Sequence, residues 1–270
     1  MADRLVVATW NVNSIRARLD LVSRFVAEHA PDVLCLQETR CPDGAFPLKA
    51  VRMLGYEHIE MNNGTKGHHG VAILSRRPLL NAEKTVLGEV DEPRHVAADV
   101  AFAGSAMRVH CLYVPAGGDV PDPAVNPKFD AKLRLLAAMQ DFCAGIAARG
   151  PGVLVGDLNI APYPEDVWSH KQLLDVVSHT PVETEGLETA RLAGPLADVV
   201  RQAIPVPEKL YTWWSYRARD WAASDRGRRL DHVWTTEDLA ARVTKVDVVR
   251  AARGWERASD HVPIVVTFTA

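Results

Sequence analysis

The stretch VLVGDLNIAP, which spans Val153–Pro162, predicts a buried strand that ends in polar residues. Its apolar run stops at Gly156, and Asp157 and Asn159 follow two positions apart. Residues i and i+2 of an extended segment point to one face, so this carboxylate and amide are presented together. Open α/β sheets bind ligands at the carboxyl ends of their strands. A simple turn explains this stretch equally well by itself, because Asp, Asn and Gly also open turns.

The overall composition is that of an ordinary globular protein. The chain has 270 residues, of which 47% are hydrophobic and 24% charged, and its formal net charge is −3. That charge excludes a globally basic, histone-like binder but still allows local contact with phosphates. The sequence shows neither an apolar run of membrane length nor signal-peptide anatomy, so we expect a cytoplasmic protein. We also expect one domain over residues 1–270 and, without a heptad pattern, a monomer.

The four cysteines lie outside any CxxC pair, and three of them sit within apolar segments. We therefore expect reduced core residues rather than disulfides or zinc ligands. These cysteines are Cys35, Cys41, Cys111 and Cys143.

Ten short apolar runs predict strands, because they are rich in Val, Leu and Ile and are bounded by turn residues. Several follow one another with no room for an intervening helix. The pattern therefore favours a mixed α/β sandwich over a purely parallel, doubly wound sheet. The predicted strands are Leu5–Val12, Asp32–Gln37, Tyr56–Met61, Val71–Leu74, His95–Phe102, Met107–Val114, Val153–Gly156, Leu230–Trp234, Val243–Val249 and Val262–Phe268.

Apolar residues at helical spacing predict helices between some of these strands. Ser14 can cap one helix, and Asn126 can cap another that has a proline at its first position. The segment Gln172–His179 is a shorter candidate. Residues 116–127 and 180–192 are predicted to be long surface loops rather than domain boundaries.

Polar side chains stand at the ends of six predicted strands. Each has a structural explanation by itself, such as a helix cap, a turn or a solvated strand end. Independent turns would use Gly, Ser and Pro more freely, so the six strand ends together indicate one site. Its members are Asn11, Asn13, Gln37, Glu38, Tyr113, Asp157, Asn159, Asp231, Asp260 and His261.

The residue types in this set favour phosphate chemistry. Four carboxylates supply the oxygen-rich ligation that Mg²⁺ or Mn²⁺ takes, and one histidine without a nearby cysteine argues against structural zinc. Asn, His and Tyr side chains are donors suited to a phosphoryl group that gains charge. The sequence has neither a G-x-S-x-G nucleophile elbow nor a P-loop. The set therefore predicts metal-assisted attack of water on a phosphate ester.

Seven motifs now identify a resemblance that extends from Thr9 to Ile264. The chain resembles the exonuclease III / AP endonuclease family of the endonuclease/exonuclease/phosphatase superfamily. The QE, GDLN and SDH elements also fit DNase I, inositol polyphosphate phosphatases and sphingomyelinases, whereas WNVNSIRARL, YVP and WWSYR with RLD point to the DNA-repair branch. The resemblance implies a four-layered, DNase I-like α/β sandwich of two mixed sheets flanked by helices. The motifs are TWNVNSIRARL, LCLQETR, LYVP, GDLNIAP, LYTWWSYR, RRLDH and ASDHVPI.

The resemblance also implies a metal side and a base. Glu38 would be the principal ligand of Mg²⁺ or Mn²⁺, with Asn13 and Asp260 on the same side. Asp157 would align and deprotonate the attacking water. One or two metal ions are both compatible with the sequence.

The other side would hold the scissile phosphate. Asn11, Asn159 and His261 would bind it, and Asp231 would accept a hydrogen bond from His261 and favour its protonated form. Tyr113 would contact the phosphate or help the leaving oxygen depart.

A basic segment follows the WWSYR motif and predicts contact with DNA. The segment Arg217–Arg229 has five arginines against two aspartates. Aromatic residues precede it or lie within it, namely Trp213, Trp214, Tyr216 and Trp221. Arginine beside aromatic residues suits backbone phosphates and exposed bases. The competing interpretation is a solvated loop whose tryptophans pack into the core. For Trp214, this interpretation explains the sequence at least as well as contact with DNA. Trp213 matches the family's pocket for an extruded, baseless sugar.

Two positions depart from the family's pattern. Most relatives carry Asn or Gln after YVP, where this chain has Ala116 followed by two glycines whose backbone amides are possible substitutes. Relatives also place an apolar or aromatic pocket wall where this chain has Arg228, next to the position of Leu230. Both departures bear on recognition of abasic sites more than on hydrolysis.

The expected function is that of a Mg²⁺-dependent DNA-repair phosphodiesterase. It would cut double-stranded DNA 5′ to abasic sites, act as a 3′–5′ exonuclease and remove blocking groups from 3′ ends. A phosphatase or phospholipid esterase of the same superfamily is the alternative, although the WWSYR segment disfavours it. A third hypothesis is a non-catalytic nucleic-acid-binding module. The complete set of site residues argues against it.

Overall fold

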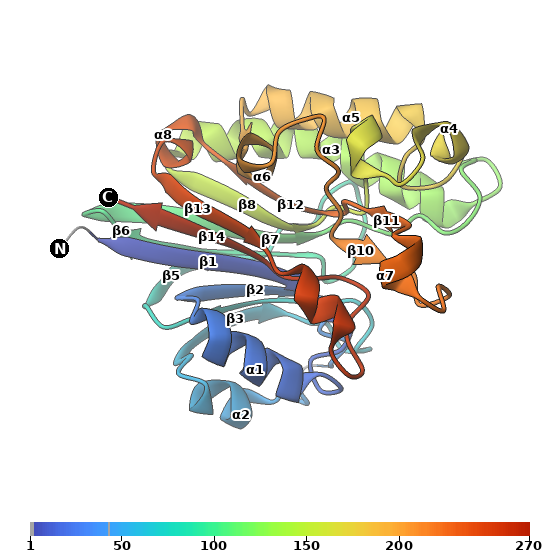
Figure 1. Cartoon of the computed structure of the whole chain (residues 1–270). Helices are drawn as coiled ribbons and strands as arrows, with labels where there is room; N and C mark the ends of the chain where they lie inside the picture. Colours follow the sequence, from blue (N-terminus) through green and yellow to red (C-terminus); the bar gives the residue numbers. More distant parts are fainter. Residues whose placement is uncertain (1–2, 43) are drawn as a thin grey trace.

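The computed structural model describes residues 3–42 and 44–270 as two mixed sheets packed face to face, with helices on both outer faces (Figure 1). This arrangement confirms the predicted four-layered α/β sandwich. The first sheet consists, in spatial order, of β13 (Val243–Val248), β14 (Ile264–Thr269), β1 (Arg4–Asn11), β2 (Val33–Gln37), β4 (Val71–Ser75) and β3 (His58–Asn62).

The second sheet packs against the first through its inner face. In spatial order it consists of β5 (Leu79–Glu83), β6 (His95–Phe102), β7 (Ser105–Tyr113), β8 (Gly152–Asp157), β12 (Asp231–Thr235) and β9 (Ala197–Asp198). A separate antiparallel ribbon lies beyond the sheets and is formed by β10 (Trp213–Trp214) and β11 (Gly227–Arg228).

The main hydrophobic core lies between the two sheets. Alternate side chains of β1 serve different cores: Leu5 and Val7 point between the sheets, whereas Val6, Ala8 and Trp10 point outward under helices. All of these side chains are buried, which explains why β1 appears in the sequence as a continuous apolar run.

Two pairs of helices form the outer layers (Figure 1). Helices α1 (Leu19–His29) and α2 (Leu48–Met53) cover the first sheet, and α3 (Pro127–Arg149) and α5 (Pro181–Ala193) cover the second. Asn126 caps α3 as predicted, because its side chain accepts a hydrogen bond from the backbone N–H of Lys128 at 3.1 Å. The shorter helices are η1 (Pro164–Asp166), α4 (His170–Leu173), α6 (Val199–Ala203), α7 (Trp221–Ser224), α8 (Glu237–Ala240) and η2 (Arg250–Gly254).

All ten predicted strands are present, with small differences at their ends. The predictions missed β5, which is a largely exposed edge strand, and three strands of two residues each, β9, β10 and β11. Residues 116–126 form the predicted loop before α3, and all four cysteines are buried thiols, as expected.

The predicted start of the first helix is wrong. Helix α1 begins at Leu19, and Arg18 rather than Ser14 precedes it. Ser14 has a φ of 86°, whereas a capping residue normally adopts the extended region. Its hydroxyl instead accepts a hydrogen bond from the backbone N–H of Ala17 at 3.4 Å, which belongs to a turn.

The predicted helix at Gln172–His179 is also wrong. Helix α4 ends at Leu173, and Ser178 has a φ of 86°, which interrupts a right-handed helix.

The predicted loop at residues 180–192 is helical, because it belongs to α5. Thr180 and Glu183 form a capping box there, and Pro181 occupies the first helical position. The sequence TPVE carried this signal, which the polar composition of the segment concealed.

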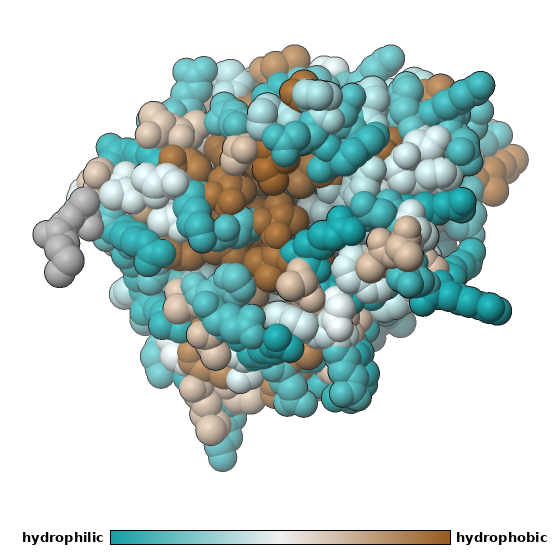
Figure 2. All heavy atoms as spheres, viewed as in Figure 1, coloured by the Kyte–Doolittle hydropathy of each residue, from teal (hydrophilic) through white to brown (hydrophobic). Residues whose placement is uncertain are grey.

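The face shown in Figure 2 is largely hydrophilic, with hydrophobic atoms gathered in its middle over α6 and β13. There the core between the sheets reaches the surface, where Ile204, Val243, Val246 and Val248 are partly buried against it. Within residues 3–42 and 44–270, every helix is too short or too polar to cross a membrane.

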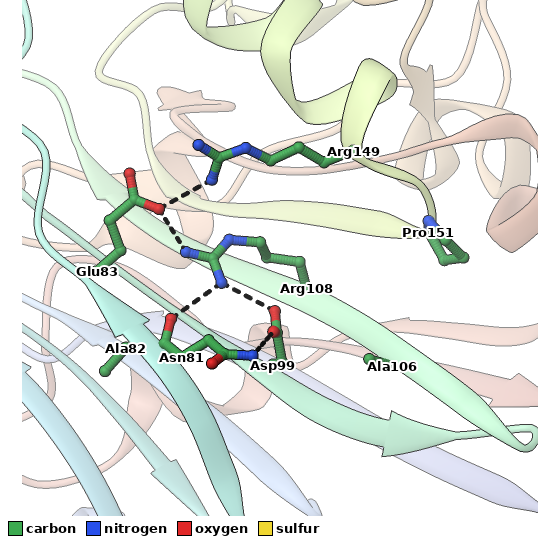
Figure 3. A pocket seen from close by; sticks show the side chains of 8 residues that line it. All are labelled: Asn81, Ala82, Glu83, Asp99, Ala106, Arg108, Arg149 and Pro151. Carbon is green, nitrogen blue, oxygen red and sulfur yellow. Dashed lines mark hydrogen bonds and ion pairs between the residues drawn. The ribbon is translucent and has the colours of Figure 1, made fainter.

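An ion-pair group formed by residues of β5, β6, β7 and α3 lies near the amino-terminal ends of β7 and β8 (Figure 3). Arg108 lies 2.6 Å from a carboxylate oxygen of Glu83 and 2.8 Å from one of Asp99, and Arg149 also contacts Glu83 at 2.9 Å. The same residues border a surface cavity of about 560 Å³. This group marks the end of the second sheet that lies opposite the candidate site.

Candidate active site

The candidate site is formed where four parallel strands end. Strand β1 pairs in parallel with β2, and β7 pairs in parallel with β8, so each pair delivers its carboxyl ends to one edge. Asn11 Nδ2 donates to Glu38 Oε1 at 3.2 Å within the first sheet and to Asp157 Oδ2 at 2.8 Å in the second. Tyr113 donates from its hydroxyl to Glu38 Oε1 at 2.6 Å. The structure therefore brings these four predicted residues together across both sheets.

Asp157 and Asn159 share one face, as the opening stretch predicted. Asp157 Oδ1 accepts from the backbone N–H of Asn159 at 2.9 Å, and Asp157 Oδ2 accepts from Asn159 Nδ2 at 3.1 Å. Asn159 has a φ of 54°, so the pair also forms a turn, and the two interpretations of this stretch are both right. Gly156 allows close strand packing, because a Cβ there would lie 1.8 Å from the backbone oxygen of Leu112.

Burial controls the acidity of Asp157. Removal from water raises the pKa of this carboxyl to about 7, against the opposing effect of His261 and the hydrogen bond from Asn11. A carboxyl with a pKa near neutrality can exchange protons at the pH of a cell.

His261 lies between two carboxylates. Its Nδ1 is 2.8 Å from Asp231 Oδ2, and its Nε2 is 3.6 Å from Asp157 Oδ2. Asp231 is also the cross-strand partner of Asp157 in the β8–β12 pair. Burial by itself lowers the pKa of His261, but the charges of Asp231 and Asp157 outweigh it and raise that pKa to about 10. The ring is therefore an imidazolium at neutral pH.

Asn13 and Asp260, two of the three predicted metal-side residues, also meet. Asn13 Nδ2 donates to Asp260 Oδ1 at 3.1 Å, and Trp213 Nε1 donates to Asp260 Oδ2 at 3.0 Å. The backbone N–H of Asn13 donates to Asn11 Oδ1 at 3.1 Å, which ties this side to the first group. Burial raises the pKa of Asp260, but His261 and these hydrogen bonds outweigh it and lower that pKa below its ordinary value.

A trio of side chains and, apart from it, Glu38 offer ligands to a cation. Among the described residues, Asp157, Asp231 and His261 have ligand atoms within 4.8 Å of one another, and Asp231 Oδ1 is buried without a hydrogen-bond partner. Glu38 lies outside that trio, and its Oε2 accepts no hydrogen bond but is 2.5 Å from Arg40 Nη2. Carboxylate oxygens that lack hydrogen bonds fit a hard divalent cation.

Tyr113 is held as a neutral phenol. Burial raises its pKa well above the ordinary value, and the negative charge of Glu38 adds to this effect. The guanidinium of Arg94 stacks over the ring at 4.9 Å and donates to the backbone oxygen of Tyr113 at 3.2 Å. The phenol is therefore a fixed hydrogen-bond donor.

A basic cavity of about 1070 Å³ adjoins the site. Arg217 and Arg228 line it together with Trp213, and the Arg228 guanidinium lies 5.4 Å from the centre of the Trp213 ring. Arg228 Nη1 also donates to Ser178 Oγ at 2.6 Å. Leu230 is buried in the hydrophobic cluster against which Trp213 packs. The four predicted substrate-binding residues therefore lie in one region.

Arg229 of the basic segment and Trp214, which precedes it, are internal rather than cavity residues. Arg229 is fully buried and forms ion pairs with Asp166 at 2.8 Å and Asp198 at 2.6 Å, so it is unavailable to a phosphate. Trp214 is buried and donates from Nε1 to Asp225 Oδ1 at 2.9 Å, which confirms the core interpretation for this tryptophan.

Two hydroxyl residues that the sequence reading overlooked hold the site together. Ser259 Oγ donates to the backbone oxygen of Asn11 at 2.7 Å and accepts from the backbone N–H of His261 at 3.2 Å. Thr212 Oγ1 accepts from the backbone N–H groups of Leu230 and Asp231. Both residues lie inside the motifs LYTWWSYR and ASDHVPI. Their place in these motifs is the sequence signal that could have identified them.

Comparison with known proteins agrees with this geometry. The sequence matches the Endonuclease/Exonuclease/phosphatase family over residues 8–261. Exodeoxyribonuclease III of Haemophilus influenzae is 29% identical over 269 residues, which cover 96% of this chain and 98% of that protein.

Two solved structures share the fold along nearly the whole chain. An AP endonuclease from Archaeoglobus fulgidus has a TM-score of 0.89 at 33% identity, with coverage of 98% of this chain and 99% of that one. The 3′ phosphatase NExo from Neisseria, bound to a product DNA hairpin, has a TM-score of 0.88 at 31% identity, with the same coverage.

The matched family is a metal-dependent one. Its members depend on divalent metal ions, and the site holds carboxylates that can bind one. Both sheets fall within the matched residues, apart from the first half of β1 and the whole of β14. The chain therefore belongs to the endonuclease/exonuclease/phosphatase family.

Proposed function

We propose that this protein is a divalent-metal-dependent DNA-repair phosphodiesterase. It cuts double-stranded DNA 5′ to abasic sites, and it trims nucleotides and blocking groups from 3′ ends as a 3′–5′ exonuclease. Its similarity to an exodeoxyribonuclease III, an AP endonuclease and a 3′ phosphatase bound to a DNA hairpin supports this substrate class. We further propose that it works in the cytoplasm as a monomer, with Mg²⁺ or in its place Mn²⁺.

The relationship between Asp157 and His261 carries the proposal. A general base works best when its pKa lies near the operating pH, and the pKa of Asp157 is about 7. His261 Nε2 is 3.6 Å from Asp157 Oδ2, which is longer than a hydrogen bond. A cationic donor and a base that face the same space suit a water molecule attacking a phosphate.

The reaction is hydrolysis. Asp157 accepts a proton from water while the water oxygen bonds to phosphorus, and the bond from phosphorus to the 3′ oxygen of the preceding nucleotide breaks. The products are a 3′-hydroxyl and a 5′-phosphate. The 3′ oxygen leaves as a hydroxyl by taking a proton, either from the neutral phenol of Tyr113, which recovers one from solvent afterwards, or from water while Tyr113 contacts the phosphate.

The phosphate is held by donors from both sheets. Asn11, Asn159 and His261 would bind its non-bridging oxygens, and Asp231 keeps His261 protonated through the 2.8 Å contact. Fixed donors of this kind stabilise the charge that develops in the transition state.

The metal ion would be held by Glu38, with Asn13 and Asp260 on the same side. A divalent cation supplies Lewis-acid stabilisation of the phosphoryl oxygens when it is bound. The trio of Asp157, Asp231 and His261 fits this role less well, because the imidazolium repels a cation and Mg²⁺ prefers oxygen ligands.

The basic cavity would receive the damaged part of the DNA. Arg217 is exposed on its rim and suits a backbone phosphate, and Trp213 offers an aromatic face. Arg228 would form a wall of the pocket for the extruded residue over the Trp213 ring, and Leu230 would support that wall from the buried cluster.

Cleavage of an end-labelled duplex with one tetrahydrofuran abasic analogue tests this proposal. The control duplex is undamaged, each reaction is run with Mg²⁺ and with EDTA, and Asp157→Asn serves as the inactive variant. We expect one Mg²⁺-dependent cut 5′ to the analogue in the wild-type reaction. A ladder from the 3′ end without that cut would restrict the function to exonuclease action, and no cleavage of either duplex would refute it.

A further inference from the structure

A fully buried ion pair lies directly behind the loop that carries Asn159. Lys132 on α3 and Glu183 on α5 are both 0% exposed, and Lys132 Nζ is 2.5 Å from Glu183 Oε1. Charged side chains are almost never fully buried without a partner, and even a paired burial carries a large desolvation cost. Apolar residues of similar volume often pack as stably as such a pair. Stability alone is therefore a poor explanation for placing these charges between two helices.

Lys132 holds two loops of the site through its ammonium group. Besides Glu183, it donates to the backbone oxygen of Asn159 at 2.8 Å and to that of Ala116 at 3.3 Å. Asn159 in turn donates from its backbone and its side chain to Asp157. All three ammonium protons have acceptors, and only one residue separates Lys132 from the proposed base.

Glu183 holds the neighbouring loop. Its carboxylate accepts from the backbone N–H of Ser178 at 2.9 Å, from that of Thr180 at 3.2 Å and from the Thr180 hydroxyl at 2.7 Å. Ser178 has a φ of 86°, which is unfavourable for a residue with a side chain and needs such support. Ser178 Oγ then accepts from Arg228 Nη1 at 2.6 Å. Glu183 is thus connected to the wall of the basic cavity.

Four charges alternate in sign along this path, from Asp157 through Lys132 and Glu183 to Arg228. Burial lowers the pKa of Lys132, and the charges of Glu183 and Asp157 oppose that effect. Burial also lowers the pKa of Arg228, which Glu183 opposes in the same way. Neighbouring charges on the path therefore attract one another in a poorly solvated region, where such attraction is strong.

The backbone leaves room for Lys132 at Gly117. This glycine has a φ of 88°, and a Cβ there would lie 2.9 Å from Lys132 Cδ and 3.0 Å from Val177 Cγ1. The glycine after Ala116 therefore allows the lysine chain to pass under the loop. Lys132 therefore explains why a glycine follows Ala116, one of the two positions that depart from the family pattern.

We propose that Lys132 and Glu183 are positioning residues that hold Asp157 and the Arg228 wall of the cavity at a fixed separation. The ion pair links the loop of Asn159 to the loop of Ser178, so DNA bound against Arg228 meets a base that is already in place. The inference rests on the proposed function, because it assigns Asp157 the role of base.

Kinetics of Lys132→Met on the tetrahydrofuran duplex test the proposal. Loss of the ammonium group frees the backbone oxygen of Asn159, so we expect kcat to fall about 10- to 100-fold, the range that follows a small misplacement of a catalytic group. KM should change much less, because Arg217 and Trp213 remain. The double variant Lys132→Gln/Glu183→Gln keeps a neutral hydrogen-bonded pair, should retain more kcat, and serves if Lys132→Met does not fold.

Met139→Ala is the matched control. Met139 lies on α3 and is fully buried, but its contacts belong to the helix–sheet core rather than to the loops. It should lose thermal stability as Lys132→Met does, while kcat of the folded enzyme stays at the wild-type value. Equal kcat values for the two variants, compared at equal folded fraction, would overturn the proposal.

Amide hydrogen exchange provides a readout that needs no activity. In Lys132→Met, exchange should accelerate at Asn159, Ser178 and Thr180 but not in the remote ion-pair group around Arg108 (Figure 3). Unchanged exchange at these three amides would also refute the proposal. A wild-type protein that cleaves no DNA would refute the proposed function, and the exchange result would then decide the positioning role alone.

Discussion

Asp157 and Asp231 are direct cross-strand partners in the β8–β12 pair, and the ring of His261 lies against both carboxylates. Two acids on adjacent antiparallel strands would repel each other if both were ionised. The imidazolium of His261 compensates that repulsion, and its protonated state in turn depends on the two acids. The strand register therefore determines the charge of the proposed phosphate-binding group.

Asp231→Asn should reduce activity through His261. Loss of this carboxylate removes the principal group that raises the pKa of His261, so the pKa should fall and the ring should become neutral at a lower pH. NMR titration of the histidine ring in EDTA would follow this change. Because a neutral ring binds phosphate less well, we expect kcat near pH 8 to fall at least tenfold, by roughly the contribution of one charged donor. An unchanged His261 pKa would contradict this account of its protonation.

Two stacked histidines predict acid sensitivity. Burial lowers the pKa of His95 to about 4 and lowers that of His110 well below its ordinary value, and the rings lie 3.1 Å apart from Nε2 to Nδ1. Below about pH 6.5 these histidines bind protons in the unfolded chain but stay neutral in the folded one. Their contribution to the free energy of unfolding is therefore fully present above that pH, and it is lost as the pH drops towards 4. Each histidine contributes a slope of up to about 1.4 kcal/mol per pH unit.

Denaturant titrations between pH 7 and pH 5 would measure this slope. The double variant His95→Gln/His110→Gln should show a flatter dependence on pH, whatever its stability at pH 7. An equal slope in both proteins would mean that other groups cause the loss.

Arg228→Leu should alter the balance of activities. The guanidinium stacks on Trp213 and bonds to Ser178, so it occupies a wall that an apolar residue would leave more open. We expect cutting at tetrahydrofuran to rise relative to trimming of undamaged 3′ ends. Arg217→Leu is the matched control. Because Arg217 is exposed, its loss should weaken binding of all duplexes alike, and the slope of log K against log[salt] should fall by about 1, the value for one phosphate contact.

Gly156→Ala should abolish folding or strongly destabilise the protein. The new methyl group would lie 1.8 Å from the backbone oxygen of Leu112, so β7 and β8 must separate next to the site. Gly145→Ala is the control, since a Cβ there meets nothing within 4 Å and a helix interior favours Ala by about 0.5–1 kcal/mol. Thermal unfolding of both variants measures the difference, and similar midpoints would contradict the packing described here.

The strand-end residues were predictable because chemistry and periodicity coincide there. Parallel strands deliver their carboxyl ends to one edge, so Asn11, Glu38 and Asp157 could be grouped before their contacts were known. Their roles came from the family resemblance rather than from the strand pattern.

Other features depend on partners that are distant in the sequence. Arg228 and Arg229 are neighbours of the same residue type. Arg229 is fully buried in ion pairs with Asp166 and Asp198, and nothing in the local sequence marks that difference. Lys132 and Glu183 likewise look like ordinary charged helix residues until α3 and α5 pack together. Burial of a charge depends on tertiary packing, which explains why these positions could not be predicted from the sequence.

The most direct test of the central claim is cleavage of a duplex with a natural abasic site in ¹⁸O-labelled water. Hydrolysis at the Asp157 site predicts a 3′-hydroxyl end upstream and one ¹⁸O atom in the 5′-phosphate of the downstream fragment, with no product from Asp157→Asn. An unlabelled phosphate with an unsaturated sugar on the 3′ end would show elimination instead of water attack, and would contradict the mechanism proposed for this site.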